Sequence, residues 1–183
     1  MKAKKIALFL IPINIILFTL VWNSINSQVK FNKEAKLRIA ENVQKLKDLR
    51  QLQINYKQAK GEFAKDFTSL TNFLENDSIV IINAIGETPD SLTEIQAIEL
   101  AIISRDTSYV PAKGNVFDET YMNSRKNQFP LDLNSLQNVP HSDVIFNIDA
   151  GQIEKGNVIV QVFEISTDYK TVFSGLDAKN KSY

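Results

Sequence analysis

The stretch from Arg50 to Leu74 reads RQLQINYKQAKGEFAKDFTSLTNFL, and it decides the fold because one long element ends within it. Helix-forming residues lie on both sides of a single glycine, Gly61. Glycine inside a helix costs about 1 kcal/mol relative to alanine, so we expect Gly61 to end the helix or to bend it. An amphipathic pattern then resumes, with four apolar residues on one face: Phe63, Phe67, Leu70 and Leu74. We predict that this face packs on a sheet, with Phe63 and Phe67 buried.

Upstream of Gly61, the chain from Gln28 onward contains no proline and no other glycine. Its apolar residues recur every three or four positions, with a mean spacing of 3.5, which is the coiled-coil period. Arg50 and Gln53 interrupt the alternative seam positions, which favours a long helix against its own domain over a strict two-stranded zipper. The predicted packing or partner interface consists of Ile39, Val43, Leu46, Leu49, Leu52 and Tyr56.

The N-terminal segment MKAKKIALFLIPINIILFTLVW is apolar from Ile6 to Trp22, with only Asn14 and Thr19 as polar interruptions. Seventeen residues rise about 25 Å as a helix, which is at the short end of a bilayer span. Trp22 ends the run where an interfacial aromatic side chain belongs. The predicted anchor residues are Ile6, Leu10, Ile15, Leu17, Val21 and Trp22.

A cleavable signal peptide is the alternative interpretation of this segment. Signal peptides have a shorter apolar region, followed by two small residues one position apart. The chain offers Ser24 and Ser27 after the run, with Ile25 where a small residue is needed, so we expect the segment to be retained. Three lysines precede the run directly, which favours a cytoplasmic N-terminus and an exported C-terminal part.

The charge is distributed unevenly, although 21 basic and 21 acidic residues cancel. From Gln28 to Lys60, nine bases against three acids give +6, and from Asp66 onward eight bases against 17 acids give −9. Basic residues near a membrane attract anionic lipid headgroups. A solvated helix surface is the simpler interpretation, and nucleic acid is not expected because no binding motif accompanies the charge.

The remainder of the chain alternates short elements. SIVIINAIG (residues 78–86) predicts a strand, and Ser91 with Glu94 predicts a capping box that opens a helix reaching Ile103. Residues 107–117 are expected to be extended, with Pro111 keeping the segment at a sheet edge or ending it, and residues 118–142 to be mostly loop with a turn at Leu133–Leu136. Two strands, 144–149 and 158–165, are predicted around a turn at 155–157, the second partly buried on both faces, with a further strand at 170–175.

Helices come first and strands cluster last, so the sequence predicts an α+β fold with an antiparallel β-sheet. The expected domains are an anchor (residues 1–27), a long amphipathic helix with the following short helix (28–75) and an exported head (76–183).

The sequence offers no chemistry of its own. It contains no cysteine, which excludes disulfides and thiolate sites. The one histidine, His141, adjoins Ser142 and Asp143, but no glycine-flanked serine elbow accompanies them. The acidic residues lack metal-ligand spacing and the six glycines are scattered, so no phosphate loop exists. We therefore expect no enzyme activity, no cofactor, no metal and no small-molecule substrate.

The motif around the junction resembles type IV pilins and type II secretion pseudopilins. In these proteins a tyrosine, a glycine, an aromatic residue and a leucine-bearing short helix recur where the long helix leaves its head; here they are Tyr56, Gly61, Phe63 and Leu70. The resemblance covers the layout of residues 1 to about 75. The glycine and glutamate that accompany processing in pilins do not occur between Met1 and Trp22, so peptidase processing and a pilus are not implied.

What the resemblance implies is a structural or assembly subunit of a bacterial envelope machine, either a pilin-like protein or an assembly-platform protein of a secretion system. It would span the inner membrane once, carry its head in the periplasm and contact other envelope components or further copies of itself. A membrane-anchored periplasmic ligand-binding or sensor module, with a pocket formed by Phe67, Phe73 and the sheet, is the alternative.

Overall fold

The computed structural model describes residues 2–87, 89, 91–125 and 129–176; for residues 2–9 and 84 it describes the backbone alone. The fold is α+β, as predicted: a long N-terminal helix precedes a small mixed region with two antiparallel two-stranded sheets. The chain divides into two compact units, one comprising Met1–Val43, Val139–Val144 and Asp168–Tyr183, the other Gln44–Asn138 and Ile145–Thr167. The domain boundaries expected from the sequence stay predictions.

Helix α1 (Lys2–Lys60) is continuous over 59 residues and contributes to both units. It passes through Pro12 and ends one residue before Gly61, which has a φ of +83°. The amide of Gly61 donates to the carbonyl of Lys57 at 2.8 Å, so the last turn is closed by a residue in the left-handed region. The expectation that Gly61 lies at a helix end is therefore confirmed.

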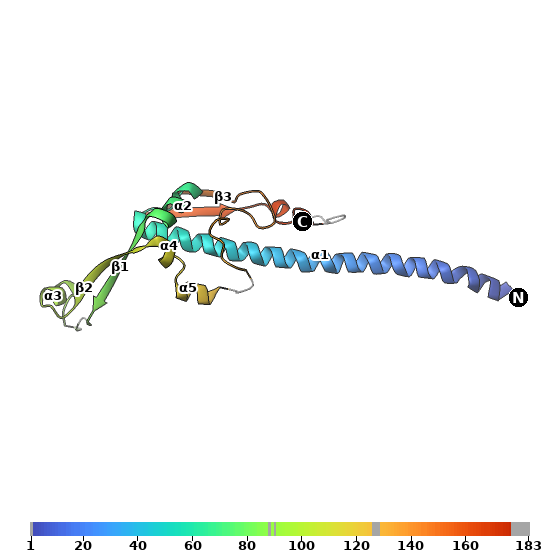
Figure 1. The fold of residues 1–183 in the computed structure, drawn as a ribbon, viewed down its shortest axis with the longest axis horizontal. Coiled ribbons are helices and arrows are strands. Elements are labelled where there is room, and N and C mark those ends of the chain that lie inside the picture. The colour runs from blue at the N-terminus through green and yellow to red at the C-terminus, as the bar shows by residue number, and fades with distance from the viewer. Residues whose placement is uncertain (1, 88, 90, 126–128, 177–183) are drawn as a thin grey trace. The chain divides into compact units, whose positions relative to one another are not determined.

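The second unit contains α2 (Phe67–Asn76), β1 (Ser78–Ile85), α3 (Glu94–Glu99), β2 (Ser104–Pro111), α4 (Ala112–Asn115), α5 (Glu119–Ser124), β3 (Asn147–Lys155) and β4 (Val158–Ser166). β1 pairs with β2 and β3 with β4, each pair antiparallel. Figure 1 shows β1 and β2 side by side, with α3 at the end remote from α4. Six side chains form the innermost core of this unit: Leu49, Leu52, Leu70, Phe73, Val116 and Phe146.

The β1–α3–β2 region differs from the prediction in its helix. The capping box is formed by Thr93 and Gln96, whose side chains each accept a hydrogen bond from the other's backbone amide, and not by Ser91 and Glu94. The helix ends at Glu99, because the residues from Ser104 onward pair with β1 instead of continuing the helical pattern. Both capping sequences are compatible with helix initiation, so tertiary context decides between them.

The strand and turn predictions are partly right. β1 and the turn between β3 and β4 lie where expected. β2 ends at Pro111, and the residues after it form α4 and are not extended as far as residue 117, because Pro111 ends the strand and stands at the start of that helix. The first strand of the terminal pair begins at Asn147, because Ile145 forms only an isolated bridge with Asn138. No residue of β4 is fully buried, but the adjacent Gln161, Val162 and Phe163 are half-buried, so this part of the strand is partly covered on both faces.

Among its described residues, the segment 118–142 is mostly irregular, with a turn at 134–137, as predicted. It also contains α5, which was not predicted and which the Asp118 carboxylate caps by accepting from the Tyr121 amide at 2.8 Å. One further prediction is wrong. The strand expected at residues 170–175 is replaced by the helical turn α6 (Tyr169–Val172), which belongs to the first unit. Val172 in this turn is buried.

Candidate functional site: a membrane anchor and a helical interface

The apolar N-terminal part of α1 has no packing partner among the described residues. Within those residues, α1 is the one helix long and apolar enough to cross a membrane, and none of its apolar window is buried. Signal sequences near an N-terminus are also long and apolar enough to meet this criterion. The finding therefore establishes an apolar helix and applies both to a retained membrane span and to a cleaved signal sequence. The described anchor residues are all exposed: Leu10, Ile15, Leu17, Val21 and Trp22. The side chain of Ile6 lies outside the described residues.

The two polar residues that interrupt this segment each donate a hydrogen bond to a backbone carbonyl of the same helix. Asn14 Nδ2 donates to the Leu10 carbonyl at 2.9 Å, and Thr19 Oγ1 donates to the Ile16 carbonyl at 2.8 Å. In hydrocarbon an unpaired polar group costs several kcal/mol, so this local pairing makes both residues compatible with a bilayer. Phe18 stacks on Trp22 with ring centroids 6.1 Å apart, which extends the aromatic surface at the end of the apolar run.

The predicted interface residues on α1 separate into two groups. Leu49 and Leu52 are 0% and 2% exposed, and they line a small cavity of about 210 Å³ together with Leu70 from α2. Ile39 and Val43 are 37% and 44% exposed. Leu46 and Tyr56 are intermediate, and the Tyr56 ring meets the Phe73 ring edge-on at 5.4 Å. Of the predicted interface, Leu49 and Leu52 therefore belong to the protein's own core, whereas Ile39 and Val43 are exposed to solvent.

The junction after Gly61 is held by hydrogen bonds to α1. Gln53 Nε2 donates to the Ala64 carbonyl at 2.8 Å, and the Ala64 amide donates to Gln53 Oε1 at 2.9 Å. Both residues are buried. The paired bonds fasten the chain to the last turns of the helix and leave no unsatisfied amide at this point.

The aromatic residues of the junction have different environments. Phe67 and Leu70 are buried, as expected for the first of them. Phe63 is only half-buried, contrary to expectation. Its ring lies 4.7 Å from that of Phe163 on β4, and the Lys57 ammonium lies 4.6 Å from its centroid. Phe63 therefore packs on a sheet as predicted, but at its edge.

A buried ion pair in the second unit was not predicted from the sequence. Arg125 Nε and a terminal nitrogen of its guanidinium donate to the two oxygens of Asp48 at 2.8 and 2.7 Å. Tyr121 Oη and Gln44 Nε2 also donate to Asp48 Oδ1, at 2.8 and 3.1 Å. Burial and the Asp48 carboxylate raise the pKa of Tyr121 well above its ordinary value, so it stays a donor. The only sign of this cluster in the sequence is Asp48, an acidic residue directly before the core residue Leu49 of α1.

The first unit has polar contacts of its own around α1. Arg38 donates to the backbone carbonyl of Ser174 at 2.6 Å, and the Phe31 and Phe173 rings lie 6.1 Å apart. His141 Nε2 lies 2.8 Å from Glu41 Oε2, which gives the one histidine a structural partner. Within the described residues, no group of three or more His, Cys, Asp or Glu side chains could hold a metal ion.

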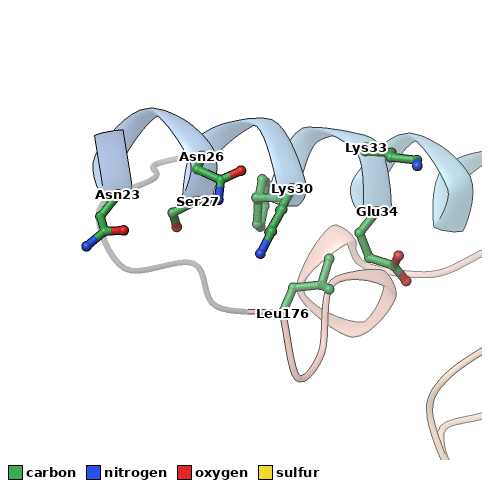
Figure 2. Close-up of a pocket in the computed structure, with 8 residues that line it drawn as sticks. Asn23, Asn26, Ser27, Lys30, Lys33, Glu34 and Leu176 are labelled. Atoms are coloured by element: carbon green, nitrogen blue, oxygen red, sulfur yellow. The ribbon is translucent and has the colours of Figure 1, made fainter. Parts of the chain in front are cut away.

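An open groove lies along α1 in the first unit, as Figure 2 shows. Its volume is about 710 Å³, and its lining is mostly polar: Asn23, Asn26, Ser27, Lys30, Phe31, Lys33, Glu34 and Leu176. Leu176 reaches toward the helix from the C-terminal turn (Figure 2). The groove presents two lysines and one carboxylate without a converging set of donors, so it has the character of a solvated helix side.

Comparison of the chain with protein-family models, with curated proteins and with solved structures finds no match.

Proposed function

We propose that the protein is a membrane-anchored structural or assembly subunit of a bacterial cell-envelope machine, which acts through helix packing and protein–protein contacts. The observation that carries this proposal is that successive parts of α1 differ in how far their apolar side chains are buried. The apolar run of α1 is exposed over the described side chains from Leu10 to Trp22, and Ile39 and Val43 are exposed on the same helix whose later turns form a core. A helix with two unburied apolar regions favours lipid around one and a protein partner around the other.

The pilin-like motif supports the same proposal. Tyr56, Gly61 and Phe63 lie at the end of α1 and at the start of the head, as the resemblance implies. The proposed topology has a cytoplasmic N-terminus, one span of the inner membrane and a periplasmic head, supported by the three lysines that abut the apolar run.

The ligand-binding alternative receives little support from the geometry. Phe67 does line a cavity, but its volume of about 210 Å³ is below the roughly 300–1,000 Å³ of ordinary ligand pockets. Its wall includes two leucines of α1 and two of α2 that are core residues of this unit: Leu49, Leu52, Leu70 and Leu74.

Two measurements test the proposal. Intact mass of the protein extracted from membranes distinguishes retention of Met1–Tyr183 at 20.7 kDa from loss of about 27 residues by signal cleavage. A photo-crosslinking side chain at Ile39 or Val43 should capture a protein partner in native membranes, whereas the same probe at the buried Leu52 should not. A cleaved N-terminus would remove the anchor, and capture of no protein from either exposed position would argue against an assembly role.

A further inference from the structure

One face of α1 carries positive charge and aliphatic groups together. Eight residues recur at alternating steps of four and three, which places them on one side of the helix. We call them the outer stripe: Val29, Lys33, Lys36, Ala40, Val43, Lys47, Arg50 and Ile54. All are exposed except Ala40, which is intermediate. The spacing is the same heptad period that the buried residues Leu49 and Leu52 follow on another side of α1.

The charge on the outer stripe is not compensated by the helix itself. The three acids between Gln28 and Lys60 are engaged elsewhere: Glu34 with Arg38, Glu41 with His141 and Asp48 with Arg125. Among the residues that the structure describes, none of the four cations of the outer stripe forms an ion pair. The stripe thus presents four positive charges and no negative one.

The complementary surface lies on β1, α3 and β2. We call Ser78–Pro111 the arm. It contains five acids and one base, a net charge of −4, and Arg105, the one base, is paired with Glu94. The arm is apolar and open at both ends: Ile95 in α3, at the tip, is 71% exposed, and Tyr109 in β2, near the base, is 72% exposed. Six further aliphatic side chains of the arm are exposed: Val80, Ile82, Ile85, Ile98, Leu100 and Ile102.

We propose that the arm of one copy of this chain docks on the outer stripe of a second copy. Both surfaces combine exposed aliphatic groups with charge, and the charges are opposite in sign and equal in number. Burying the two apolar surfaces against each other removes them from water, and the opposite charges fix partner and register. The contact is heterologous, because two different patches of the chain meet. This inference rests on the proposed function and names the partner.

Anionic lipid is the competing occupant of the outer stripe. It accounts for Lys33 and Lys36 but not for Lys47, which lies about 38 Å along the helix from Trp22, several times the Debye length of about 8 Å. Lipid headgroups would also not bury the exposed aliphatic residues between the cations, and binding to them would not explain the acidic charge of the arm. A second copy supplies a complementary partner for both the outer stripe and the arm.

The absence of cysteine from the chain makes the test direct. Two differently tagged full-length copies, one with Ile95→Cys in the arm and one with Val43→Cys in the stripe, are co-expressed, and their membranes are treated with a short bismaleimide. The expected product is the mixed dimer. Lys33→Glu with Lys36→Glu in the Val43→Cys copy should lower its yield at least tenfold, and Glu87→Lys with Glu99→Lys in the other copy should restore it. The matched control, Lys113→Glu with Lys170→Glu, changes the same charge at exposed sites and should leave the yield unchanged.

The remaining outcomes separate this inference from the proposed function. Dimers that join Val43→Cys only to itself would show symmetric helix pairing, and a different protein captured there would show another partner. Both results overturn arm docking and leave the assembly role standing. Failure of the reversed pair to restore the yield also overturns arm docking. Absence of any crosslinked product from Val43→Cys, together with a monomer in mild detergent, would overturn both proposals.

Discussion

Gln53 and Ala64 exchange two hydrogen bonds across the end of α1, at 2.8 and 2.9 Å, and both residues are buried. The carboxamide of Gln53 thus pairs with the backbone of Ala64 as a neighbouring strand does in a β-sheet. It satisfies one donor and one acceptor in a turn that has left the helix and has not yet entered α2.

Replacement of Gln53 by leucine should destabilise the protein by about 2–4 kcal/mol, because it leaves the buried amide and carbonyl of Ala64 unpaired. Urea unfolding of the purified full chain, followed by circular dichroism, measures this loss. Gln58→Leu is the control, since Gln58 is exposed on the same helix and its replacement should change the free energy of unfolding by less than about 0.5 kcal/mol. Equal effects of the two changes would contradict the role of the paired bonds.

Asp48→Asn should cost about 3–5 kcal/mol, since it leaves the buried Arg125 guanidinium without its carboxylate. Asp48→Leu combined with Arg125→Met should recover most of that loss, because no charge is then buried. The same unfolding measurement applies, with Glu62→Gln as an exposed control. If the single and double variants were equally unstable, the ion pair would not be the source of the effect.

Tyr121 makes the stability depend on alkaline pH. Its pKa is raised above the ordinary value of 10.0 by burial, by its hydrogen bond to Asp48 and by the charge of that carboxylate. The neutral phenol is therefore favoured in the folded state. Its contribution to stability is fully present below pH 10 and is lost as the pH rises toward the raised pKa.

Ultraviolet titration of the phenolate band should accordingly show one tyrosine that ionises after the others, and Tyr121→Phe should remove that step. The difference in unfolding free energy between the native chain and this variant should shrink as the pH rises above 10. A difference that stays constant to pH 12 would contradict the assignment.

Two glycines with positive φ should respond differently to alanine. At Gly61 an added Cβ meets no atom within 4 Å, so only backbone strain of about 1–2 kcal/mol is expected. At Gly86, with φ +103°, the Cβ would lie 2.5 Å from the Ile102 carbonyl oxygen. Gly86→Ala should therefore be clearly the more destabilising in thermal unfolding. Gly151→Ala, at an open position without positive φ, is the control.

The parts of the fold that follow from local patterns are those that the sequence predicts well. Gly61 ends a run of helical periodicity, a β-branched run forms β1, and a glycine-containing turn joins β3 to β4. Each signal lies within about ten residues of chain. The helix start at Thr93 was missed because Ser91 offers a competing cap of equal quality.

The interface was harder to predict, because periodicity does not show which side of a helix is covered. Val43 and Leu49 belong to one sequence of apolar residues spaced three or four apart, yet Val43 lies on an exposed side of α1 and Leu49 is fully buried. The buried partner of Asp48 lies 77 residues away in the chain, and no local rule connects the two. The basic and acidic halves of the sequence were evident, but the structure was needed to show that the acids of α1 are already paired.

The arm has a consequence for local stability. An isolated two-stranded ribbon is marginal in water, and the exposed Ile82, Ile85 and Tyr109 contribute little buried area to hold β1 against β2. The amides of this ladder are therefore expected to exchange with solvent far faster than those of α1 beside Leu49 and Leu52. Any surface that covers the arm must slow that exchange, so the ordering of this ribbon becomes part of the free energy of association.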